Sequence, residues 1–256
     1  MGPSDLTVAP STGRSATQLG FWAAILTVAV ALVFAAIAIP TPARSGPFCE
    51  RACVSYPYVD VAQFIPGDYL WLVPGILLAA IFVVLMGSIH AYAAESKRIY
   101  SRIGLSFAVV YAVLILVDYF LQLTVVLPSL QAGETDGLSL FTQYDPHGLF
   151  IALESLGYAM LTIALLFAAP VFAGGRAERA IHWLFVSGFV LMVAAFVGLA
   201  VVRRDLVAFE VTVLTITWAV LIPSGALLGI VFRRAARALD ADAEPPGDAR
   251  RPRRPL

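Results

Sequence analysis

The stretch AVLILVDYFLQLTVVLP, residues 112–128, is apolar almost throughout, yet it contains Asp118 and Gln122. In a water-soluble protein, such a run would form a buried core helix with a costly acidic residue in its middle. In a lipid bilayer, it would form most of one membrane crossing, which needs about 20 residues. The composition of the whole chain decides which of these two solvents applies.

The chain of 256 residues is 60% hydrophobic and 13% charged, with a mean hydropathy of +0.85. An ordinary soluble domain is roughly 45–50% apolar and about 25% charged. The composition therefore predicts an integral membrane protein, with membrane lipids as its immediate partners. The formal net charge is zero, so nothing suggests nucleic acid as a partner.

Six stretches are apolar and long enough to cross a membrane, and they span residues 17–40, 68–94, 103–128, 147–173, 180–202 and 207–232. Because lipid offers no hydrogen bonds to an open backbone, each should be a helix. We therefore expect an all-α fold, a polytopic bundle of six membrane-spanning helices over residues 17–232. A leader over 1–16 precedes it, and the polar, proline-rich tail over 233–256 is expected to be disordered. The first stretch exceeds the apolar core of a signal peptide and favours an uncleaved anchor, while the small residues at its end leave cleavage as the alternative.

The basic residues predict an orientation. Arginine and lysine gather in the short loops 95–102 and 174–179 and in the tail after residue 232. Such loops stay in the cytoplasm, so both termini should be cytoplasmic and the loops 41–67 and 129–146 should lie outside. The alanine- and arginine-rich composition indicates a bacterial protein, located in the cytoplasmic (inner) membrane. Both outer loops carry aromatic residues, so we expect recognition to occur on the outer face.

The two cysteines, Cys49 and Cys53, lie in the first outer loop, where the compartment is oxidising by this topology. Their spacing of four fits a local disulfide. The functional alternative is a redox pair, although membrane thiol oxidases use two residues between the cysteines and several pairs in relay. A zinc site is disfavoured because no histidine lies near in sequence. We therefore expect a structural disulfide.

Three polar residues share one face of the third apolar stretch. Asp118 and Gln122 are four residues apart, and Tyr111 precedes Asp118 by seven, spacings that place all three on one side of a helix. Asp118 falls near the middle of the membrane. A carboxylate facing lipid there costs at least ~2.5–3.5 kcal/mol, so Asp118 should face other helices.

A second polar face belongs to the fourth stretch, where His147, Glu154 and Tyr158 follow at spacings of seven and four. Since this helix runs antiparallel to the third, Glu154 and Tyr158 should lie near the depth of Asp118. Glu210 lies near the outer end of the sixth stretch. The candidate ligand-binding residues are therefore Tyr111, Asp118, Gln122, His147, Glu154, Tyr158 and Glu210.

Buried polar residues also have structural explanations. A side chain such as Gln122 commonly joins membrane helices by hydrogen bonds, and Glu210 is positioned to reach outward to Arg203 or Arg204. Acids such as Glu154 within a membrane helix instead mark sites and pathways by default. A metal site of acids and His147 is conceivable, but no tight ligand spacing supports it, and we expect neither a metal nor another cofactor.

Residues 146–190, PHGLFIALESLGYAMLTIALLFAAPVFAGGRAERAIHWLFVSGFV, resemble the corresponding stretch of uncharacterised six-helix bacterial integral membrane proteins grouped as a domain of unknown function. The resemblance implies a multi-pass inner-membrane protein and assigns no activity and no site residues. No phosphate loop, nucleophile elbow or other catalytic signature occurs in the chain.

Three functions are compatible with these patterns. The first is a non-enzymatic membrane protein with a polar pocket in its outer half, which binds or passes a small molecule, lipid headgroup, proton or cation. The second is an intramembrane enzyme that acts on a lipid or quinone, with Asp118 and Glu154 as acid and base. The third is a structural or assembly subunit whose acids only join helices. A cavity lined by Asp118, Glu154 and Tyr158 would favour the first two.

Overall fold

The computed structural model describes residues 13–243, and this part of the chain is helical and contains no strand. The long helices are α1 (Arg14–Ala38), α2 (Leu72–Tyr92), α3 (Arg98–Leu121), α5 (Leu149–Ala168), α6 (Arg176–Ala195) and α7 (Leu206–Ala243). A π-helical segment, Gln122–Val126, joins α3 to the short α4 (Leu127–Ala132), and a second one, Phe196–Val202, follows α6. Six helical segments have the length and composition to cross a membrane, which confirms the predicted fold class.

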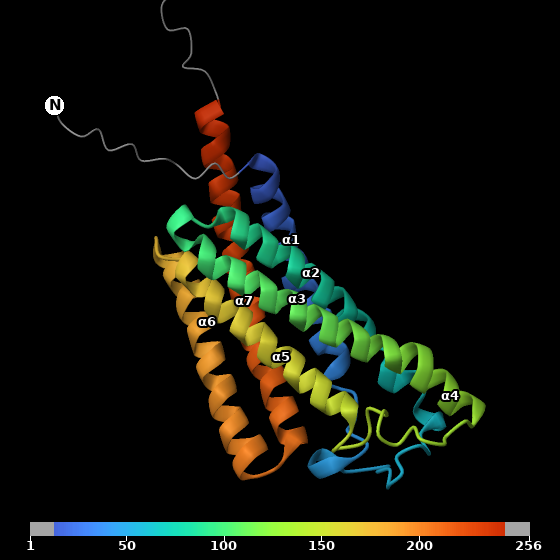
Figure 1. The fold of residues 1–256 in the computed structure, drawn as a ribbon. Helices are drawn as coiled ribbons and strands as arrows, with labels where there is room; N and C mark the ends of the chain where they lie inside the picture. The colour runs from blue at the N-terminus through green and yellow to red at the C-terminus, as the bar shows by residue number, and fades with distance from the viewer. Residues whose placement is uncertain (1–12, 244–256) are drawn as a thin grey trace, which may run out of the picture.

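The helices form one bundle in which α3 packs against α2 and α5, and α1 packs against α2 and α7 (Figure 1). Helix α6 lies at the edge, against α7 and α5. Arg14 Nε of α1 and Asp240 Oδ1 of α7 are 3.2 Å apart, so the described chain begins and ends on the same side of the bundle. The connections 39–71 and 133–148 lie together at the opposite end, which we call the loop end.

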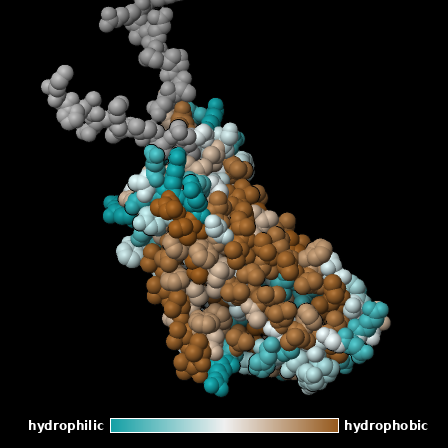
Figure 2. Space-filling view, viewed as in Figure 1, coloured by the Kyte–Doolittle hydropathy of each residue, from teal (hydrophilic) through white to brown (hydrophobic). Residues whose placement is uncertain are grey.

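The sides of the bundle are apolar. On the face that Figure 2 shows, a largely hydrophobic surface with a few hydrophilic side chains lies between hydrophilic ends. Large side chains on it are well exposed, for instance Trp22 at 55% and Trp183 at 66%. So extensive an apolar surface would not be stable in water and is suited to lipid. Inside, helices approach closely: a Cβ at Gly104 of α3 would lie 2.8 Å from the Ala164 carbonyl oxygen of α5, a small-residue contact typical of membrane helices.

The structure corrects the predicted element boundaries. The tail was expected to be disordered from residue 233, but α7 continues to Ala243, because the arginine, alanine and leucine residues that follow the apolar segment are strong helix formers. Residues 244–256 of that predicted tail, and 1–12 of the predicted leader, lie outside the described residues. The third crossing starts at Arg98 and continues through α4 to Ala132, so the second loop begins later than residue 129.

The first loop is closed on itself near the cysteines. Cys49 and Cys53 form a disulfide, as the sequence predicted. The backbone N–H of Val54 donates to the carbonyl of Arg44 at 2.7 Å, which closes the segment that contains the disulfide. This closed segment follows the end of α1 and lies beside the beginning of α7, where a Cβ added at Gly46 would lie 3.5 Å from Val207 Cγ2.

Candidate functional site

A cavity of about 190 Å³ lies at the loop end of the bundle, between α1, α5, α7 and the two loops. Two of the three acidic side chains that line it are Glu154 from α5 and Glu210 from α7, which are only 0% and 8% exposed. The other residues that line it are Phe34, Ala38, Thr41, Pro42, Ala43, Arg44, Asp68, Trp71, Gln143, Tyr144, Val211 and Leu214. A polar interior within an otherwise apolar bundle distinguishes this region from the rest of the core.

Glu154 and Glu210 face the same cavity from two neighbouring helices, α5 and α7. A hydrogen bond between two such carboxyl groups would require a proton on one of them, because an ionised carboxylate only accepts. The Tyr119 hydroxyl donates to Glu154 Oε1 and lies 3.3 Å from the Tyr158 hydroxyl. Glu154 Oε2 is buried, and no hydroxyl or amide donor of the described residues reaches it. Tyr119 thus fixes one oxygen of Glu154, and the other oxygen is available to a ligand in the cavity.

A bidentate ion pair forms a second polar wall of the cavity. Arg44 Nε lies 2.8 Å from Asp68 Oδ2, and Arg44 Nη2 lies 3.2 Å from Oδ1. The Tyr144 hydroxyl donates to the same Oδ2 at 3.3 Å, and the guanidinium lies 3.7 Å from the centre of the Phe64 ring. The hydrogen bond to Asp68 raises the pKa of Arg44, and burial raises the pKa of Tyr144. The charge of Arg44 is therefore retained and already compensated by Asp68.

Aromatic rings complete the wall. Trp71 and Phe34 both line the cavity and stack nearly parallel, with ring centroids 5.8 Å apart. The Trp71 ring also meets the edge of Tyr119, with centroids 5.5 Å apart. Trp71 therefore connects the cavity wall to the tyrosine that holds Glu154, so packing in this aromatic group sets the position of the acid.

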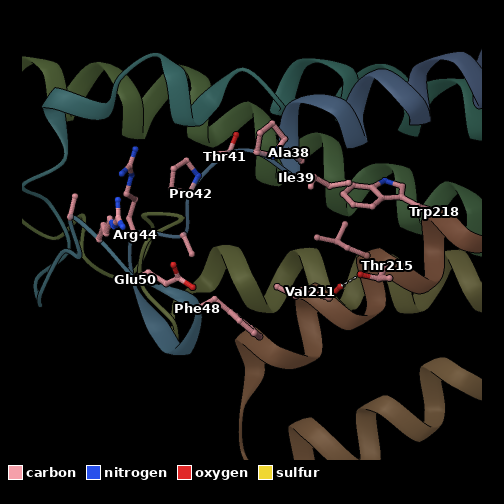
Figure 3. A pocket seen from close by; sticks show the side chains of 15 residues that line it. Ala38, Ile39, Thr41, Pro42, Arg44, Phe48, Glu50, Val211, Thr215 and Trp218 are labelled. Carbon is pink, nitrogen blue, oxygen red and sulfur yellow. Dashed lines mark hydrogen bonds between the residues drawn. The ribbon is translucent and has the colours of Figure 1, made fainter.

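The cavity continues into a groove of about 740 Å³ between α7 and the segment from the end of α1 to the disulfide loop. Both spaces are lined by Ala38, Thr41, Pro42, Ala43, Arg44, Val211 and Leu214. Figure 3 shows Val211, Thr215 and Trp218 on α7, with the residues of the first loop across the groove from them. The groove is mostly apolar, with Glu50 and Arg51 among its lining residues in the loop.

The predicted site residues fall into two groups. Glu154 and Glu210 line the cavity, and Tyr158 and Tyr111 are buried behind it, with ring centroids 5.8 Å apart. Asp118 faces the bundle interior, as predicted, and is 3% exposed, and its Oδ2 has no hydrogen-bond partner in the part of the chain that the structure describes. It does not line the cavity, however. The acid that the sequence placed at the centre of the site lies beside it.

Two other candidates have different positions from those expected. Gln122 Nε2 donates to the Phe141 carbonyl at 2.6 Å, so this side chain holds the second loop. His147 is exposed and does not line the cavity, because α5 begins only at Leu149 and leaves His147 in the preceding turn. Glu210 does not reach out to an arginine: within residues 13–243, the ion pairs are those of Arg14 and Arg44.

Sequence reasoning missed four residues of the site: Arg44, Asp68, Trp71 and Tyr119. Tyr119 stands next to Asp118 and lies eight residues after Tyr111, a spacing that returns to the same face of a helix. Asp68 opens the second apolar stretch, and Arg44 is one of the few basic residues on its side of the predicted topology. These signals were present, but only the fold shows that loop residues 44 and 68 meet.

Comparisons with known proteins assign no function to this cavity. No protein-family model, curated protein or solved structure matches the chain. The resemblance to six-helix bacterial membrane proteins therefore stays a prediction. Among the described residues, no group of three or more His, Cys, Asp or Glu side chains could hold a metal ion. What the cavity does must follow from its carboxyl pair, its ion pair and its aromatic wall.

Proposed function

We propose that this protein is a multi-pass protein of the bacterial cytoplasmic membrane that binds a positively charged or proton-donating group in its loop-end cavity. The observation that carries the proposal is the pair of buried glutamates, Glu154 and Glu210, on the wall of a cavity that opens into a groove. Buried acids in membrane helices are costly and are retained at binding sites and ion pathways. The ligand is a small molecule, a lipid headgroup, a cation or a proton.

The charge distribution supports the orientation in this proposal. The short connections 93–97 and 172–175, at the end opposite the cavity, adjoin Lys97, Arg98, Arg102, Arg176 and Arg179. Because positively charged short loops remain in the cytoplasm, both termini are assigned to the cytoplasm. The cavity then lies in the outer half of the membrane and faces the outer leaflet.

Binding fits the geometry better than the two alternatives. The enzyme hypothesis gave the acid and base roles to Asp118 and Glu154, but only Glu154 lines the cavity. A substrate in the cavity would therefore touch one of the two groups. The structural-subunit hypothesis expects acids that only join helices. Glu154 does contact Tyr119 in this way, yet it also faces a cavity together with a second acid.

Dicyclohexylcarbodiimide tests the proposal, because it enters lipid and reacts with protonated carboxyl groups in apolar surroundings. The carboxyl proton moves to a nitrogen of the reagent while the carboxyl oxygen bonds to its central carbon, and the product rearranges to a stable acylurea. In membranes that contain the full chain, peptide mass spectrometry should find the adduct on Glu154 or Glu210. Such an adduct shows that the cavity is open from the lipid and has bound a proton.

Two variants control this experiment. Glu154→Gln/Glu210→Gln should lose the adduct, while Asp118→Asn should keep it, because Asp118 is equally buried but does not line the cavity. If wild-type protein in membranes carries no adduct on either glutamate, under conditions that modify the unfolded protein, the cavity does not present a protonated acid to the membrane. That result would overturn the proposed function.

A further inference from the structure

We infer that the ligand is a membrane-borne amphiphile with a positively charged nitrogen, whose head occupies the cavity and whose alkyl chain lies in the groove. This inference rests on the proposed function and names the class of ligand. Its basis is the combination of an uncompensated acid pair, an aromatic wall and an adjoining apolar groove.

The charges of the cavity favour a cation. Three acids line it, Asp68, Glu154 and Glu210, against a single base, Arg44. Arg44 makes two hydrogen bonds to Asp68, so these two charges satisfy each other. The glutamate pair remains. Glu154 is 0% exposed, and within residues 13–243 no hydroxyl or amide donates to its Oε2. A positively charged ammonium head, including a quaternary one without N–H groups, can supply the charge that this pair lacks.

The aromatic wall narrows the type of cation. Trp71 and Phe34 line the same cavity as the glutamates. The faces of aromatic rings attract cations, and tryptophan does so most strongly, especially where water is excluded. Organic ammonium groups benefit from both contacts, since their methyl or methylene groups pack on rings while the charge meets a carboxylate. A small inorganic cation would use only the carboxylates.

The volumes of the cavity and the groove indicate where the head and the tail of the ligand would lie. Pockets for complete small-molecule ligands usually measure about 300–1,000 Å³, and the cavity, at about 190 Å³, falls below that range. It fits a head group. The groove adds about 740 Å³, and its walls include Ile39, Leu214 and Trp218. Leu214 lines both spaces, so a chain attached to the head would pass it and continue along the groove.

The position of the groove indicates that the ligand arrives from the membrane. One wall is a stretch of α7 within a membrane-spanning segment, and Val211 on it is 44% exposed. An amphiphile already in the bilayer reaches such a groove by lateral diffusion, with its chain remaining in apolar surroundings. A small water-borne ammonium ion would fill the cavity but would leave the groove empty.

Equilibrium binding of radiolabelled dodecyltrimethylammonium tests the inference, with the full-length protein in micelles of the uncharged detergent dodecyl maltoside. The wild type should bind the probe saturably. Glu154→Gln/Glu210→Gln should weaken binding by about tenfold or more, because the head group loses the carboxylates that compensate its charge. Glu210→Gln alone changes the more exposed acid and should also weaken binding of the probe. It replaces the double variant if that variant fails to fold. Asp118→Asn is the matched control and should bind like the wild type.

Two further probes separate the parts of the ligand. Tetramethylammonium has the charge without the chain and should bind about tenfold more weakly or worse; equal affinity would overturn the membrane-borne amphiphile. Dodecyl sulfate has the chain with a negative head and should show no saturable binding; equal affinity would overturn the requirement for a cation. If the wild type does not bind dodecyltrimethylammonium while carbodiimide still modifies Glu154 or Glu210, this inference fails and the proposed function stands. If the wild type neither binds dodecyltrimethylammonium nor carries the carbodiimide adduct, both this inference and the proposed function are refuted.

Discussion

Replacing Gly75 of α2 with alanine should destabilise the protein through Tyr119, the residue that holds Glu154. The new Cβ would lie 2.4 Å from Tyr119 Cε2, far inside the ~3.5–4.0 Å of a favourable carbon contact. Tyr119 is fully buried. Its ring lies between Trp71 and Phe150, with centroid distances of 5.5 and 6.0 Å. The ring cannot move aside without disturbing its neighbours or pulling its hydroxyl away from Glu154.

The magnitude combines three effects. Overpacking in a well-packed core costs about 1–3 kcal/mol. Loss of the Tyr119 hydrogen bond to the buried Glu154 costs about 1–3 kcal/mol. Replacing a helical glycine with alanine stabilises a helix by about 1 kcal/mol, which offsets part of this loss. We therefore expect Gly75→Ala to lower the free energy of unfolding by about 1–5 kcal/mol.

Unfolding by dodecyl sulfate in mixed micelles, followed by circular dichroism, measures this change. Gly87→Ala in the same helix is the matched control. Apart from the helix's own adjacent backbone, no heavy atom of the described residues lies within 4 Å of its new Cβ, so it should stabilise the protein by about 0.5–1 kcal/mol. Tyr119→Phe should cost about 1–3 kcal/mol, and its effect should be less than additive with Gly75→Ala because both lose one hydrogen bond. A Gly75→Ala variant as stable as Gly87→Ala would refute the reasoning.

Three more outcomes are expected. A reporter inserted at the exposed Gly137 and one at the C-terminus should lie in opposite compartments, and matching compartments would contradict the proposed orientation. In intact membranes, Cys49 and Cys53 should resist thiol labelling until a reductant is added, since they form a disulfide; labelling without a reductant would disprove the bond. Arg44→Ala leaves Asp68, whose side chain is 7% exposed, without its partner. It should lower the free energy of unfolding by about 2–4 kcal/mol, and the same loss in an Asp68→Ala background would show that the pair is not responsible.

The sequence by itself predicted that this protein lies in a membrane and which segments form its membrane-spanning helices. Length and hydropathy of each apolar stretch are local properties, and in lipid they leave the backbone only the helical solution. The four-residue spacing of Cys49 and Cys53 likewise predicted the disulfide. The inward orientation of Asp118 followed from the cost of exposing a carboxylate to lipid. Each of these conclusions needs only one segment and its surroundings.

The tertiary structure decided which polar residues meet. Helical periodicity places Asp118 and Gln122 on one face, but the π-helical segment that begins at Gln122 changes the turn at that position, and Gln122 bonds to the second loop. Glu154 and Glu210 line one cavity only because α5 and α7 are neighbours. The contact of Arg44 with Asp68 depends on how the first loop folds back. Helix order, tilt and rotation arise from the packing of all six helices together, so no single stretch of sequence contains them.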